Sequence, residues 1–217
     1  MLIEIYKLYF AALRAGHAGQ GLDIHGMDYL MDDIVKTGDG ALLEERVLAV
    51  HRLKTAVPAE VLARMGALVG GGTPEQVDAI GAYFGAVGLA FQIMDDVLNL
   101  RGLYTDEADL KKKVMLKTLG EDITAGKVTI PVAKAMGILD EKDRVALWKD
   151  ISSKPDDPEM VADIITRLED CGAIQMCADE AEKIVEDAWA IMDEITDDSF
   201  AKCMLRSFGA FVCYRHT

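Results

Sequence analysis

Three oxygen-bearing side chains lie close together in the stretch FQIMDDVLNL, residues 91–100, namely Asp95, Asp96 and Asn99. On a helix, Asp95 and Asn99 point the same way, and Asp96 lies about 100° round the axis, where one ion can still reach all three. A set of carboxylate and amide oxygens suits Mg²⁺. The spacing therefore predicts a magnesium site on a helix, although a helix that merely reaches solvent at Asp95 would explain the same residues.

Cations that could balance these carboxylates lie elsewhere in the chain. The segment KTLGEDITAGK, residues 117–127, begins and ends with lysine, and Lys54-Thr55 stands in an otherwise apolar neighbourhood. Lysine ammonium groups act as point charges for phosphate oxygens, and the glycines of the first segment let the backbone approach a ligand. Gln92 adds an amide one helical turn before the aspartates. The alternative for a lone Lys-Thr pair is a surface pair whose ammonium reaches water.

The acidity of the whole chain limits the class of partner. Its 217 residues carry a formal net charge of −14, so we expect no binding to nucleic acid, which requires a basic face. An acidic protein that handles an anionic ligand must gather its few cations locally or borrow charge from a metal. The longest uncharged run falls short of the roughly 20 residues of a spanning helix. We therefore expect a soluble protein without a transmembrane segment, in a compartment that the sequence does not identify.

Helical periodicity accounts for most of the chain and sets the fold class. The expected helices cover residues 2–20, 44–68, 74–101, 131–139, 141–152, 158–171, 173–196 and 199–214. Pro58 predicts a kink or break inside the second of them. We find no alternating run that predicts a strand, and the polar stretch 105–126 is too long for a simple turn. The sequence predicts an all-α fold in a single domain, residues 1–217.

The helix expected from Pro74 to about Arg101 has a defined start and one thin face. Thr73 offers an N-cap, Gln76 stands at the capping-box spacing, and proline suits the first helical position. Three glycines, separated by four and three residues, follow along the helix: Gly81, Gly85 and Gly88. Another helix can approach closely along such a face, so we expect this helix to be central and buried.

Four segments together resemble the trans-type polyprenyl diphosphate synthases and look closest to geranylgeranyl diphosphate synthases. They are GQGLDIHG (19–26), RLKTA (52–56), GLAFQIMDDVLNL (88–100) and KTLGEDITAGKVTIPVA (117–133), in the family's order and approximate spacing. The resemblance implies an isoprenoid-synthase-type helical bundle with Mg²⁺ as cofactor and isoprenyl diphosphates as substrates. It implies condensation of isopentenyl diphosphate with an allylic diphosphate to a longer polyprenyl diphosphate. It also implies a homodimer, or a heteromer with a related synthase subunit.

The same resemblance assigns roles to individual residues. Asp95 and Asp96 would bind Mg²⁺ as the second aspartate-rich motif, with Asn99 where many members carry a third aspartate. The catalytic residues that would contact the allylic diphosphate or its metals are Lys54, Thr55, Gln92, Lys117 and Lys127. Gln20 and Asp23 would line the same substrate cavity.

One family motif has no counterpart among these 217 residues. Family members carry a first aspartate-rich motif, DDxxD followed by arginines, on an upstream helix, whereas Asp28, Asp32 and Asp33 have the wrong spacing and order. We therefore expect a bundle that lacks the N-terminal helices, which make up roughly the first third to half of a synthase. We also expect little or no synthase activity in the isolated chain. A fragment of an active enzyme would explain this, as would a natural partner subunit that has lost catalysis; the retained charged cluster favours the fragment.

Two other classes of protein also fit part of the pattern. A non-enzymatic helical interaction protein would carry Asp95 and Asp96 as mere surface charges. A terpene cyclase shares the metal-assisted ionisation of a diphosphate but cyclises its product. The KT, FQ and GEDxxxGK segments favour chain elongation over cyclisation.

Overall fold

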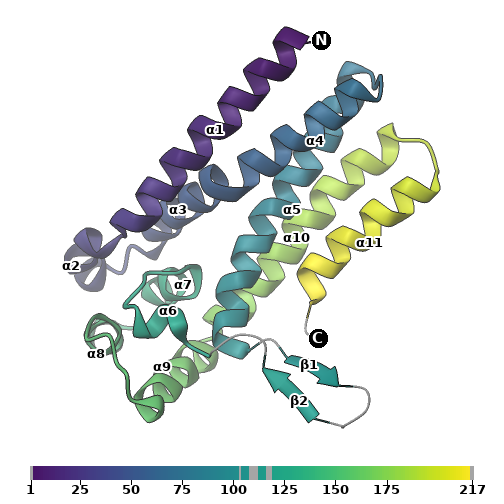
Figure 1. Cartoon of the computed structure of the whole chain (residues 1–217). Coiled ribbons are helices and arrows are strands. Elements are labelled where there is room, and N and C mark those ends of the chain that lie inside the picture. Colours follow the sequence, from purple (N-terminus) through teal and green to yellow (C-terminus); the bar gives the residue numbers. More distant parts are fainter. Residues whose placement is uncertain (1, 103, 108–111, 116–118, 216–217) are drawn as a thin grey trace. The chain divides into compact units, whose positions relative to one another are not determined.

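Helices dominate the computed structural model of this chain, which describes residues 2–102, 104–107, 112–115 and 119–215 (Figure 1). In chain order the elements are α1 (Leu2–His25), α2 (Asp28–Thr37), α3 (Gly40–His51), the π-helix η1 (Arg52–Ala56), α4 (Val57–Val69), α5 (Pro74–Arg101), β1 (Tyr104–Glu107), β2 (Lys112–Met115), α6 (Glu121–Thr124), α7 (Ile130–Ile138), α8 (Glu141–Ser152), α9 (Pro158–Asp170), α10 (Ala173–Ile195) and α11 (Phe200–Tyr214). The predicted all-α class is confirmed, with one short antiparallel hairpin, β1–β2, added to it.

The first two expected helices differ from the observed ones at their ends. α1 continues through Gly21 to His25, because a single glycine costs a helix only about 1 kcal/mol, and it ends where Gly26 takes a left-handed φ of 75°. The helix expected from residue 44 begins at Gly40, where the Asp39 carboxylate accepts a hydrogen bond from the Leu42 N–H at 3.0 Å. That N-cap is a sequence signal that the periodicity alone did not include.

The break predicted from Pro58 takes the form of the π-helix η1. Proline has no N–H to donate to the carbonyl of Lys54 four residues earlier, and its ring crowds that carbonyl. The chain widens by one residue instead, and the N–H of Val57 donates to the carbonyl of Arg52 five residues back. Such single-turn π segments are frequent at functional sites, and this one carries the Lys54-Thr55 pair.

The bounds predicted for α5 are confirmed, and so is its capping box. The N–H of Gln76 donates to the Thr73 hydroxyl at 3.3 Å, and the N–H of Thr73 donates to the Gln76 amide oxygen at 3.0 Å. α7 to α11 lie within one residue of their predicted limits. The hairpin and the single turn of α6 were missed inside the stretch 105–126, because elements of four residues carry too little periodicity to identify.

The chain divides into two compact units, and α3, α5 and α10 contribute to both of them. Unit 1 comprises residues 1–25, 48–92 and 179–214, and unit 2 comprises residues 26–47, 93–178 and 215–217. The organisation of residues 1–217 as a single domain stays a prediction.

In unit 1, the glycine face of α5 packs against α4 and η1, as its spacing predicted. A Cβ atom on Gly88 would lie 3.0 Å from the Ala56 Cα and 3.1 Å from the Ala59 Cβ. α11 runs antiparallel to the later part of α10 (Figure 1), and a Cβ on Gly209 would lie 3.0 Å from the Val185 side chain. Close helix contacts in this unit therefore depend on positions without a side chain.

In unit 2, most residues of α7 from Ile130 to Met136 are shielded from solvent. A Cβ on Gly40 would lie 2.6 Å from the Ala133 carbonyl, so α3 and α7 meet with their backbones nearly in contact. Arg144 of α8 donates to the carbonyl oxygens of Val35 at 2.8 Å, Leu139 at 2.6 Å and Lys36 at 3.3 Å. This guanidinium thereby ties the end of α2 to α8.

Among the described residues, α5 is the one helix that is long and apolar enough to cross a membrane by length and composition, with a mean hydropathy of 1.5 over its best window. Of that window, 56% is buried inside the structure, and core helices share the same length and composition. The absence of a transmembrane segment therefore stays an expectation.

Candidate metal and diphosphate site

Asp96 lies near the end of α5 with its carboxylate at the start of α7. Its Oδ2 accepts a hydrogen bond from the Ile130 N–H at 3.1 Å, and the residue is only 7% exposed. The first N–H groups of a helix have no partner within the helix, and the helix dipole favours negative charge there. The backbone of α7 therefore orients this carboxylate.

Burial, more than the neighbouring charges, sets the protonation of Asp96. Burial raises the pKa of the Asp96 carboxyl to about 7, and the neighbouring carboxylates of Asp122 and Asp95 add to the rise. The Ile130 N–H and the ammonium of Lys127 act in the opposite direction but do not cancel the effect of burial. An added cation would stabilise the charged form of this buried carboxylate and thereby offset the cost of its burial.

Asp95 is more exposed than Asp96 and has a different partner. Its Oδ1 accepts a hydrogen bond from Nη2 of Arg215 at 2.5 Å, and the two residues are 120 positions apart. Sequence reasoning missed Arg215, because no local pattern connects it with Asp95.

Asn99 has a structural contact that its helical spacing did not indicate. The side chain is 1% exposed, and its Oδ1 accepts a hydrogen bond from the Asp122 N–H at 3.1 Å. Its backbone carbonyl accepts from the Gly120 N–H at 2.7 Å, so Asn99 fixes the start of α6. An amide oxygen has two lone pairs, and its role as a metal ligand stays a prediction.

The glycines on either side of α6 have conformational and packing roles in this structure. Gly120 and Gly126 adopt φ values of 73° and 71°. A Cβ on Gly120 would overlap the Val161 side chain, and one on Gly126 would lie 2.9 Å from Cγ of Lys154. That these glycines let the backbone approach a ligand stays a prediction. Lys117, the first lysine of the segment 117–127, lies outside the described residues.

Lys54 is held in unit 1 by two contacts with α1. Its ammonium donates to Oδ2 of Asp23 at 2.7 Å, and the Asp23 side chain is 16% exposed. Gly19 lets α1 approach, since a Cβ there would lie 2.8 Å from the Lys54 Cα. The structure thus pairs two of the predicted site residues, Lys54 and Asp23.

Two apolar cavities of unit 1 contain predicted site residues. Thr55 lines a cavity of about 540 Å³ together with Phe84 and Phe91 of α5 and Phe208 of α11. Gln20 lines another cavity, of about 470 Å³, formed by α1 and α4. Thr55 and Gln20 therefore belong to different cavities within this unit, and Gln92, at the end of the α5 segment in unit 1, is partly buried.

The pair Asp95 and Asp96 fits one mode of Mg²⁺ binding. In the part of the chain that the structure describes, no three His, Cys, Asp or Glu side chains gather into a metal-binding group. Mg²⁺ does not need such a group, because it keeps several waters and binds through one or two carboxylates together with substrate phosphates. The buried charge of Asp96 is what such an ion would offset, so these residues fit Mg²⁺.

Comparison with known proteins shows the family to which this chain is similar. Residues 2–168 match the family model described as polyprenyl synthetase. A short chain isoprenyl diphosphate synthase of Methanothermobacter thermautotrophicus is 33% identical over 197 residues, which cover 91% of this chain and 54% of that protein. A heterodimeric geranylgeranyl pyrophosphate synthase large subunit 2 of Arabidopsis thaliana is 32% identical over 128 residues, 59% of this chain and 29% of that protein. The chain thus spans about half the length of the first relative and less of the second.

A solved structure agrees in fold. The geranylgeranyl pyrophosphate synthetase of Pyrococcus horikoshii superposes with a TM-score of 0.78 at 28% identity, over 98% of this chain and 59% of that one. The expected isoprenoid-synthase-type helical bundle is confirmed by this likeness.

Proposed function

This chain belongs to the polyprenyl synthetase family, and we propose that it carries the second aspartate-rich site of a Mg²⁺-dependent prenyltransferase of isoprenoid biosynthesis. The reaction condenses isopentenyl diphosphate with an allylic diphosphate to give a longer polyprenyl diphosphate. The observation that carries the proposal is the buried carboxylate of Asp96, held by the Ile130 N–H at 3.1 Å beside Asp95, with Lys127 close enough to lower its pKa.

In unit 2, Asp95 and Asp96 are the residues that would hold the metal. When bound, Mg²⁺ supplies positive charge that neutralises diphosphate oxygens as the bond to the allylic carbon breaks. The Ile130 N–H fixes the Asp96 carboxylate, so the ligand does not have to be ordered when the ion arrives. Lys127 contributes a second positive charge for the diphosphate.

In unit 1, Lys54 and Thr55 on η1 provide an ammonium and a hydroxyl for the diphosphate. Negative charge grows on the departing oxygens, so cations fixed in advance bind the transition state better than the ground state. Asp23 holds the Lys54 ammonium at 2.7 Å and thereby limits the rotamers that binding must otherwise freeze. We assign a further polar contact with the diphosphate to Gln92.

The hydrocarbon tail of the substrate also needs a site, and we assign it to the apolar cavity of about 540 Å³ that Thr55 lines. Phe84, Phe91 and Phe208 supply most of the aromatic surface of that cavity. Burial of each methylene contributes about 0.8 kcal/mol, so a tail of isoprene units adds substantial affinity without polar contacts. For assembly we propose a second copy of this chain or a related subunit, since one relative is named as a subunit of a heterodimeric synthase.

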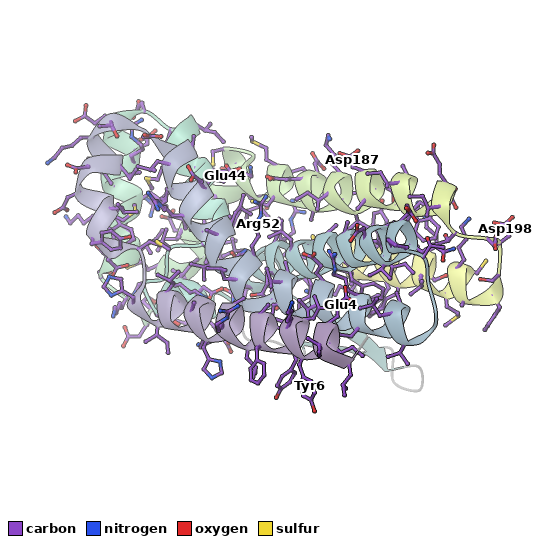
Figure 2. The ribbon with its side chains drawn as sticks, turned by 90° about the horizontal axis from the view of Figure 1, so that it is seen from above. Glu4, Tyr6, Glu44, Arg52, Asp187 and Asp198 are labelled. Atoms are coloured by element: carbon purple, nitrogen blue, oxygen red, sulfur yellow. The ribbon has the colours of Figure 1, made fainter. Side chains whose placement is uncertain are left out.

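Calorimetry on the purified chain with Mg²⁺ and methylene diphosphonate, a non-hydrolysable diphosphate, tests the metal site. We expect Mg²⁺-dependent binding that Asp95→Asn weakens at least about tenfold, because one of two carboxylate ligands is lost. Asp187→Asn, on the exposed surface of α10, is the matched control (Figure 2). Absence of binding, or equal binding by Asp95→Asn, would refute the site.

Product analysis tests the reaction itself. Residues 1–217 contain no first aspartate-rich motif, so we expect the isolated chain to bind metal and diphosphate with little or no condensation. Linear products from a preparation that supplies the missing motif would support elongation, and cyclic products would support a terpene cyclase instead.

A further inference from the structure

Arg215 forms an ion pair with Asp95, one of the two proposed metal ligands. The residue follows directly after α11, and its Nη2 donates to Oδ1 of Asp95 at 2.5 Å. The Arg215 side chain is only 12% exposed, whereas that of Asp95 is 36% exposed. A largely buried guanidinium that donates to a carboxylate at this distance forms a strong, charge-assisted hydrogen bond.

The same carboxylate cannot serve both cations equally well. Oδ1 of Asp95 already accepts the Arg215 hydrogen bond, so an ion that takes this oxygen at the roughly 2.0–2.1 Å of a Mg²⁺–oxygen bond must displace the guanidinium. A guanidinium and a divalent ion at one carboxylate also repel each other. The groups whose charges act on the neighbouring Asp96 are Asp95, Asp122 and Lys127, so an ion that binds there without Asp95 loses one of the two proposed carboxylate ligands.

We propose that Arg215 is a resident counter-cation of Asp95 that a divalent metal ion must displace, so that this arginine sets the metal affinity of the site. The inference rests on the proposed function, because it takes Asp95 as a ligand of Mg²⁺. In the metal-free protein the arginine neutralises one carboxylate. Metal binding breaks this ion pair and releases the guanidinium.

Metal titration of charge-changing variants tests the competition. In calorimetric titrations of the full chain with Mg²⁺ alone, Arg215→Gln should bind about tenfold more tightly than wild type, equivalent to about 1.4 kcal/mol. Arg215→Lys retains a cation and should stay closer to wild type. Arg206→Gln is the matched control, since Arg206 of α11 pairs with Glu186 at 2.7 Å within unit 1. It should leave the affinity unchanged.

A second measurement uses the wild-type chain and does not depend on the folding of a variant. Trypsin cleaves after arginine, so cleavage between Arg215 and His216 releases the last two residues, and intact-mass spectrometry detects this loss. Mg²⁺ should accelerate this cleavage severalfold in wild type, because the released guanidinium enters the protease. Asp95→Asn should be cleaved fast with or without Mg²⁺.

The outcomes separate this inference from the proposed function. If Asp95→Asn binds Mg²⁺ as tightly as wild type, the metal site itself is refuted. If Asp95→Asn loses affinity but Arg215→Gln binds no more tightly, or if Mg²⁺ leaves the trypsin cleavage unchanged, the site stands and displacement of Arg215 is refuted.

Discussion

Gly19 of α1 and Lys54 of η1 meet with their backbones in contact, since a Cβ atom on Gly19 would lie 2.8 Å from the Lys54 Cα. Only glycine fits at this crossing. Asp23, one helical turn later on α1, pairs with the ammonium of the same lysine at 2.7 Å. α1 therefore positions both the backbone and the side chain of the residue that we assign to diphosphate binding.

Alanine at position 19 should disrupt this crossing. We expect Gly19→Ala to lower the free energy of unfolding by about 2 kcal/mol or more, because the added methyl overlaps the Lys54 backbone and the helices must separate. Urea denaturation measures the change. Gly21→Ala is the matched control on the same helix, since a Cβ there meets nothing within 4 Å, and it should raise stability by up to about 1 kcal/mol. Equal effects of the two variants would contradict the contact.

Asparagine at position 96 should separate the stability of the protein from its metal binding. The raised pKa of Asp96 means that its stabilising contribution is present below the unfolded pKa near 4 and is lost as pH rises through about 7. At pH 8 without metal we expect Asp96→Asn to be more stable than wild type by on the order of 2 kcal/mol, and by much less at pH 5.

Urea denaturation at both pH values checks this prediction, and Asp197→Asn, an exposed position, controls for the loss of one charge. A Mg²⁺ concentration that saturates wild type should stabilise wild type at pH 8 and stabilise Asp96→Asn much less, because a ligand that binds only the folded state stabilises it in proportion to its affinity. If the free energies of unfolding of wild type and Asp96→Asn differ by the same amount at pH 5 and pH 8, the raised pKa of a buried Asp96 is contradicted.

Loss of the Arg144 guanidinium should loosen unit 2. Arg144→Gln removes donors to the carbonyl oxygens of Val35, Lys36 and Leu139, and we expect the free energy of unfolding to fall by about 2 kcal/mol. Thermal unfolding followed by circular dichroism measures the effect. Arg46→Gln, at an exposed position of α3, should change stability by less than about 0.5 kcal/mol. A small effect of Arg144→Gln would show that water replaces these hydrogen bonds without cost.

Tyr83 offers a prediction at alkaline pH. Its hydroxyl donates to the Leu205 carbonyl at 2.7 Å, and burial raises the pKa of Tyr83 to about 12. The folded state thus favours the neutral form of Tyr83. The contribution of this hydroxyl to the free energy of unfolding is lost as pH rises from about 10 through about 12. Tyr83→Phe should cost about 1 kcal/mol at pH 8, and the cost should shrink at pH 10.5.

Urea denaturation at the two pH values measures the cost of the Tyr83 substitution. Tyr6→Phe is the control, because Tyr6 is 56% exposed and points away from the ribbon in Figure 2. A cost for Tyr83→Phe that grows with pH would contradict the assigned direction of the shift.

The amino-acid sequence by itself determined the helical class, most helix bounds and the candidate residues. Capping residues such as Thr73 and Pro74 and the 3.6-residue period act over a few neighbouring positions, so they can be read locally. The break at Pro58 was also local, although the sequence did not show that the break would be a π-helix. The short turns around α6 carried too few residues for any period.

The tertiary structure alone decided what each candidate residue contacts. Asp96 meets the N–H of Ile130, Asn99 meets that of Asp122, and Arg215 reaches Asp95 from 120 residues away. Burial, and with it the raised pKa of Asp96, depends on how distant helices pack around a site. Local sequence fixes which groups a helix presents, but only the packing of segments far apart in the chain fixes their partners and their charge.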